Sequence, residues 1–162
     1  MVIFIVLLSA CQMLPERKEK PAEVKDATID ERINPQNQQK SVIETVPLMN
    51  NAVMGLYNQS QELYKDNKFN KAIANLERAY EIQPSVGKVP QLLAEIQLHK
   101  GDFRQAHYWA TIATKNGPAK GSSCVKSWRI LAVAAGELGY FAQQTKALET
   151  QQACMVKAAN RY

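Results

Sequence analysis

Three cysteines are the side chains of this sequence with the widest choice of chemistry. Cys11 closes an apolar run at the N-terminus, whereas Cys124 and Cys154 lie 30 residues apart near the C-terminus. A cysteine can carry a lipid, bind a metal as a thiolate or form a disulfide, and the redox compartment selects among these states. The chemistry of these thiols therefore depends on where the chain resides.

No other group of residues has the spacing of an active site. The sequence contains no Gly-rich phosphate loop, no closely spaced pair of cysteines, no HExxH motif and no nucleophile elbow. His99 and His107 flank an expected turn, without a carboxylate or cysteine placed to complete a metal-ligand set. We therefore expect a protein that is not an enzyme and that holds no metal and no cofactor.

The N-terminal run, MVIFIVLLSACQML, is apolar apart from Ser9 and Gln12. A helix that spans a membrane needs roughly 20 apolar residues, so this run is too short to cross one. It has the length of the hydrophobic part of a secretory signal, about 7–15 residues followed by small residues. The stretch Leu8–Cys11 resembles the bacterial lipobox. That resemblance implies a signal peptide over residues 1–10 and a lipid on Cys11.

The position after the cysteine also carries information in lipoproteins. Gln12 stands there in place of aspartate, and by the same resemblance this implies the outer membrane. Three acyl chains would anchor the protein almost permanently, because each buried CH₂ contributes about 0.8 kcal/mol. One feature departs from the pattern, since no Lys or Arg precedes the apolar run. An apolar N-terminus that docks on the domain therefore stays open as an alternative.

Residues 11–50 have the composition of a tether. They are rich in Pro, Lys, Glu, Gln and Asn, and carry six Lys/Arg against seven Asp/Glu. Such a segment cannot bury enough apolar surface to offset the entropy of ordering, so we expect disorder. A short helix over Val24–Ile33 is the alternative. Fully extended, its part from Met13 to Pro47 would reach at most roughly 120 Å.

The remaining chain, residues 51–162, is long enough for one domain and is basic, with a net charge of +6. It has no dense Lys/Arg cluster interleaved with aromatic residues, so we do not expect a nucleic-acid partner. An internal repeat is visible instead. Lys68–Pro84 aligns with Asp102–Pro118 at an offset of 34 residues. The matched pairs are Phe69 with Phe103, Ala72 with Ala106, Ala79 with Ala113, and Pro84 with Pro118.

This period and pattern resemble the tetratricopeptide repeat. Two antiparallel helices pack through small residues in that family, an aromatic residue fills the gap near their turn, and a proline ends the second helix. The resemblance covers residues 51–158 and implies an all-α solenoid with repeats at about 52–85, 86–119 and 124–158. The third repeat departs from the pattern because Gln144 replaces the small residue. We expect its last helix to cap the domain, with Gln151, Gln152 and Lys157 facing water.

In this arrangement Cys124 and Cys154 can meet. Two antiparallel helices that turn near Gly139 place Cys124 opposite a residue next to Cys154. In an oxidising compartment we expect these cysteines to form a disulfide. By the loop-entropy model it would stabilise the domain by roughly 3–4 kcal/mol.

Repeats of this kind bind peptides or helices in a groove lined by the first helix of each repeat. Taken singly, any residue on these helices could be an ordinary solvated side chain. As a set, helical spacing predicts that a partner-binding groove is formed by Tyr57, Gln61, Tyr64, Lys65, Lys88, Gln91, Glu95, His99, Lys126 and Arg129. We expect Trp109 and Trp128 to pack between helices.

A lipid anchor, a tether and a small repeat domain resemble the lipoprotein activators of class A penicillin-binding proteins. The resemblance implies a monomer on the periplasmic side of the outer membrane that binds a peptidoglycan synthase. Two alternatives stay open: a pilotin-like lipoprotein of pilus or secretion machinery, and a general scaffold for envelope assembly.

Overall fold

The computed structural model describes residues 28–35 and 47–155, and every regular element in these ranges is a helix. The expected all-α class is therefore confirmed for this part of the chain. In chain order, the helices are α1 (Ile29–Ile33), α2 (Asn51–Lys65), α3 (Phe69–Ile82), α4 (Lys88–His99), α5 (Phe103–Asn116), α6 (Ser122–Glu137) and α7 (Phe141–Ala153).

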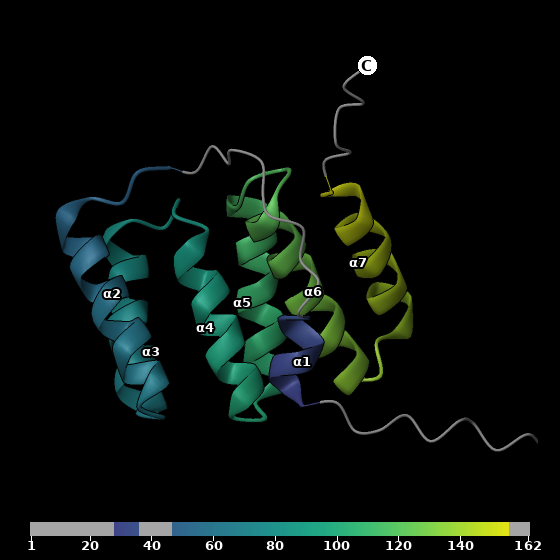
Figure 1. Cartoon of the computed structure of the whole chain (residues 1–162), viewed down its shortest axis with the longest axis horizontal. Coiled ribbons are helices and arrows are strands. Elements are labelled where there is room, and N and C mark those ends of the chain that lie inside the picture. Colours follow the sequence, from purple (N-terminus) through teal and green to yellow (C-terminus); the bar gives the residue numbers. More distant parts are fainter. Residues whose placement is uncertain (1–27, 36–46, 156–162) are drawn as a thin grey trace, which may run out of the picture.

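Helices α2 to α7 form three antiparallel pairs, α2 with α3, α4 with α5 and α6 with α7 (Figure 1). Each pair also packs on the next one, through α3 against α4 and α5 against α6. The first helices of the second and third pairs, α4 and α6, contact each other directly. The chain therefore forms a stacked row of helical hairpins.

The same backbone conformation ends the first helix of each pair. Asn67, Gly101 and Gly139 have φ of 57°, 75° and 74°. Glycine adopts this left-handed region freely, and asparagine is among the few other residues that tolerate it. Each of the three pairs therefore turns at a residue that tolerates this conformation.

Small residues allow the helices of the first two pairs to approach closely. Ala72, Ala79, Ala106 and Ala113 are all fully buried, and each pair of alanines lies on one face of its helix. Phe69 and Phe103 begin α3 and α5 and pack against the core, and Pro84 and Pro118 follow the ends of these helices. Trp109 is buried and Trp128 packs partly buried against the core, as expected.

The third pair accommodates Gln144 by a compensating glycine. A Cβ atom added to Gly136 of α6 would lie 2.5 Å from Nε2 of Gln144 in α7. The small residue has therefore moved from the second helix to the first, which gives the glutamine side chain room. The prediction that Gln151 faces water is wrong, because this residue is only 8% exposed. Gln152 is exposed, and Lys157 lies outside the described residues.

Cys124 and Cys154 are joined in a disulfide, with Sγ atoms 2.00 Å apart and Cα atoms 5.7 Å apart. The bond connects the first turn of α6 to the residue that follows α7. Gly121 also donates a backbone hydrogen bond to the carbonyl of Cys154 (3.0 Å). Both contacts hold the end of the last hairpin closed.

Part of the segment expected to be a tether is helical. Helix α1 begins at a capping box, in which Thr28 Oγ1 accepts from Glu31 N and Glu31 Oε2 accepts from Thr28 N. It packs on α6 and buries Ile33 completely. The alternative of a short helix over Val24–Ile33 is thus correct for Ile29–Ile33. The other residues of the expected tether, 11–27 and 36–46, lie outside the described residues.

Candidate functional site

A hollow of about 220 Å³ lies between the first helices of the three pairs. We call it the central hollow. Seven of the ten residues predicted for a groove line it, together with one apolar residue that the prediction missed. The lining residues are Tyr57, Gln61, Tyr64 and Lys65 of α2, Gln91, Leu92 and Glu95 of α4, and Lys126 of α6.

An ion pair crosses the floor of the central hollow. Nζ of Lys126 lies 2.8 Å from Oε2 of Glu95, and the side chains are 27% and 7% exposed. Because Glu95 is almost completely buried, its carboxylate depends on this cation for compensation. The pair also connects α4 to α6. Lys65, at the rim, forms instead an exposed ion pair with Glu62 of its own helix (2.7 Å).

The two tyrosines of the hollow are permanent hydrogen-bond donors. Burial raises the pKa of Tyr57, and the negative charge of Glu95 raises it further. Burial also raises the pKa of Tyr64, with smaller contributions from Glu95 and Asp30. Both hydroxyl groups therefore stay protonated at physiological pH. The hollow offers a partner the exposed parts of two tyrosine side chains beside one compensated carboxylate, and the Tyr64 hydroxyl already contacts His99.

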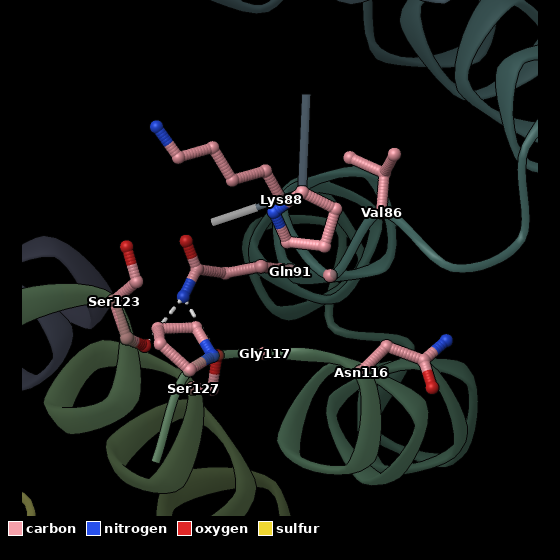
Figure 2. A pocket seen from close by; sticks show the side chains of 10 residues that line it. Val86, Lys88, Gln91, Asn116, Gly117, Ser123 and Ser127 are labelled. Carbon is pink, nitrogen blue, oxygen red and sulfur yellow. Dashed lines mark hydrogen bonds between the residues drawn. The ribbon is translucent and has the colours of Figure 1, made fainter. Parts of the chain in front are cut away.

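Gln91 has a structural role at the edge of the hollow. Its Nε2 donates to the carbonyl of Ser123 (2.8 Å) and to Oγ of Ser127 (2.7 Å), and these bonds join α4 to α6 (Figure 2). Lys88 does not line the central hollow. It lines a second cavity of about 10 Å³ near Pro47, which has room for about one water molecule.

His99 and Arg129 do not line the central hollow either. Both residues contact α1 instead. Nε2 of His99 lies 3.5 Å from Oδ1 of Asp30, and Nη1 of Arg129 donates to the carbonyl of Ile33 (3.3 Å). Burial lowers the pKa of Arg129. His99 is still adjacent to the hollow, since its Nδ1 contacts the hydroxyl of Tyr64 and the two rings stack with centroids 5.4 Å apart.

The sequence contained a signal for α1. Thr28 and Glu31 have the spacing of a capping box, and Ile29 and Ile33 are four residues apart, hence on one face of a helix. Disorder was nevertheless the main prediction for this segment, because residues 11–50 are rich in proline and in polar residues. Leu92 had no comparable signal, because an apolar residue on a first helix is as consistent with the core as with a groove.

The remaining sequence predictions concern lipid attachment, membrane spanning and metal binding. Cys11, the predicted lipid site, lies outside the described residues. Among residues 28–35 and 47–155, no helix is long and apolar enough to span a bilayer. The same residues contain no cluster of three His, Cys, Asp or Glu side chains that could hold a metal ion.

The fold is similar to that of two solved domains. The first is the second TPR of Spaghetti (RPAP3) bound to the HSP90 peptide SRMEEVD. It has a TM-score of 0.59 and 17% identity, and the match covers 64% of this chain and 93% of that chain. The second is the globular C-terminal domain of P. aeruginosa LpoP, with a TM-score of 0.53, 23% identity, and coverage of 66% and 98%.

At these identities the similarity establishes the fold, which is a tetratricopeptide-like helical array. No family profile matches the chain, and no curated protein matches it either.

Proposed function

We propose that this protein is an outer-membrane lipoprotein whose tetratricopeptide-like domain binds a protein partner through the central hollow. The observation that carries the proposal is the convergence of three helices on this one site. Seven predicted groove residues, which are spread over α2, α4 and α6, line a single hollow. First helices of such repeats form the binding surface in repeat arrays generally.

The central hollow is smaller than a typical small-molecule site, and its lining residues suit a protein interface. Its volume of about 220 Å³ is below the range of typical small-molecule sites, about 300–1,000 Å³. Tyrosines are frequent anchors of protein interfaces, and Tyr57 and Tyr64 lie together here. The similar TPR domain of Spaghetti is bound to a short peptide, which supports a peptide segment as the ligand of this fold.

The anchoring part of the proposal rests on the N-terminal sequence. Residues 1–10 act as a signal peptide, Cys11 carries the lipid, and the residues that follow place the domain in the periplasm. A disulfide between Cys124 and Cys154 is compatible with that oxidising compartment. Mass spectrometry of the mature N-terminus tests this part. Acylated Cys11 is the expected result, and an unprocessed Met1 would contradict it.

The partner that we propose is a class A penicillin-binding protein, which the domain activates. The order of anchor, tether and repeat domain resembles the lipoprotein activators of these synthases. The match to the globular C-terminal domain of LpoP covers 98% of that domain, so the similarity extends over the complete domain. The reach of the N-terminal segment, roughly 120 Å when extended, would bring the domain towards the peptidoglycan layer.

A site-specific photo-crosslinker tests both the partner and the site. The reactive amino acid replaces Gln61, which lines the central hollow. The matched control replaces Gln59, an exposed glutamine of the same helix that contacts Asn75 of α3 (2.9 Å). We expect a bifunctional synthase to be captured from cell envelopes at position 61 and not at position 59. Capture of a secretin at position 61 would favour the pilotin-like alternative and refute our proposal.

A further inference from the structure

Helix α1 covers the surface next to the central hollow. Two residues predicted for the groove, His99 and Arg129, contact α1. The hollow itself ends at Tyr64, whose hydroxyl contacts His99. The predicted groove is therefore divided into an open half, the central hollow, and a half that a segment of the same chain occupies.

Five contacts hold α1 on this surface, two from aliphatic side chains and three from polar groups. Ile33 is the anchor, because it is fully buried in the core cluster. Arg32 pairs with Glu137 at 2.6 Å, with both side chains about one third exposed. The guanidinium of Arg129 binds the last carbonyl of the helix, and His99 faces Asp30. The contacts thus combine two aliphatic side chains, fully buried Ile33 and partly buried Ile29, with partly exposed polar pairs.

This mode of attachment favours reversible docking. A helix of five residues has no stability of its own in water, since isolated helices shorter than about 12 residues are marginal. Its order depends on one fully buried side chain, on partly buried Ile29 and on polar pairs of the kind that contribute little when exposed. The chain joins α1 to α2, so a released helix stays at a high local concentration, in the millimolar range for short connections.

The geometry points to competition with a partner. The central hollow has room for only a few side chains, so a longer partner segment must continue beyond it. A segment that follows α4 from Glu95 towards His99 reaches the place where Asp30 lies. Both halves are lined by the same first helices, α4 and α6, and they meet at the contact between Tyr64 and His99.

We propose that α1 is a removable occupant of the groove, and that a bound partner segment displaces it. In the free protein α1 protects the surface of His99 and Arg129. In the complex an aliphatic side chain of the partner takes the place of Ile33. Only the identity of the partner rests on the proposed function; the removable docking of α1 does not.

Hydrogen exchange of the full-length protein tests the docking directly. The amides of Arg32 and Asn34 donate within α1, to the carbonyls of Thr28 and Asp30. We expect these amides to exchange far faster than the core amides of α6. Arg32→Glu should accelerate their exchange roughly three- to tenfold, because it places like charges at the Glu137 contact. Arg32→Glu/Glu137→Arg should restore the wild-type rate.

Slow exchange of the α1 amides would overturn the inference. If the α1 amides exchange as slowly as those of α6, and if Arg32→Glu leaves them unchanged, α1 is a fixed wall and the inference is overturned. Ile33→Asp provides a stronger release, because an unpaired carboxylate cannot enter the buried site. It should free α1 without altering the exchange of α6, and loss of protection in both helices would contradict a separable occupant.

Titration with a purified bifunctional synthase tests the competition. Ile33→Asp should bind severalfold more tightly than the wild type, and Arg32→Glu/Glu137→Arg should match the wild type. Weaker binding by Ile33→Asp would show that α1 belongs to the binding surface, which overturns the inference. Absence of binding by every variant would refute the proposed partner, and the exchange experiment would then decide the inference alone.

Discussion

The pairing of Glu95 with Lys126 makes a specific prediction about the floor of the central hollow. Replacing Lys126 with methionine leaves a carboxylate that is 7% exposed without its cation. Removal of one partner from a fully buried pair costs about 3–5 kcal/mol. Lys126 itself is 27% exposed, so water screens part of the interaction and we expect a loss of about 2–3 kcal/mol.

Two further variants separate the ion pair from simple loss of a lysine. Glu95→Gln/Lys126→Met removes both charges and should recover to within about 1 kcal/mol of the wild type, because no uncompensated charge remains. Lys65→Met removes a lysine from the exposed pair with Glu62, whose side chains are 67% and 71% exposed. We expect that substitution to cost at most about 0.5 kcal/mol.

Urea denaturation followed by circular dichroism measures these differences in the free energy of unfolding. The ion pair is confirmed if Lys126→Met is the least stable of the three variants and the double substitution recovers. The reasoning is refuted if Lys126→Met costs no more than Lys65→Met. It is also refuted if the double substitution is less stable than Lys126→Met.

Three further predictions concern the frame around the site. Intact-mass measurement without reductant should show Cys124 and Cys154 oxidised, and Cys124→Ser/Cys154→Ser should lose about 3–4 kcal/mol; two free thiols would contradict this. Gly87→Ala should cost about 1–3 kcal/mol, because the new Cβ would lie 2.7 Å from the backbone nitrogen of Gly117. Gly136→Ala should cost less than about 1 kcal/mol, because its Cβ meets only the movable end of the Gln144 side chain. Equal melting temperatures of the two variants would contradict this. Asn67→Ala should lose about 1 kcal/mol at its positive φ while Asn67→Gly stays near the wild type, as thermal unfolding can check.

The frame of the domain could be predicted from the sequence because its signals are local and repeated. The offset of 34 residues placed Ala72 and Ala106 on matching helix faces, and both are fully buried. Turn and helix-end residues such as Asn67 and Pro84 need no tertiary information, because their backbone preferences are intrinsic. The helices therefore lie close to where the repeat pattern predicted them.

The details that were missed depend on tertiary packing. Gln151 was expected to face water because it lies on the last, capping helix, but its side chain is only 8% exposed. The docking of α1 pairs Arg32 with Glu137, residues more than a hundred positions apart, which no local pattern reveals. Helical spacing selected ten candidate groove residues, and seven of them line the central hollow. It could not show that Arg129 is covered by another segment of the chain.

The most direct test of the central claim is the affinity of the purified protein for a bifunctional synthase. Tyr57→Ala removes an aromatic side chain from the central hollow. Tyr108→Ala is the matched control, because Tyr108 is 55% exposed on α5, away from that hollow. We predict that Tyr57→Ala weakens binding by about thirtyfold, the effect of truncating an interface anchor of about 2 kcal/mol, and that Tyr108→Ala binds like the wild type. Equal affinities of the two variants, or no binding by the wild-type protein, would contradict the assignment.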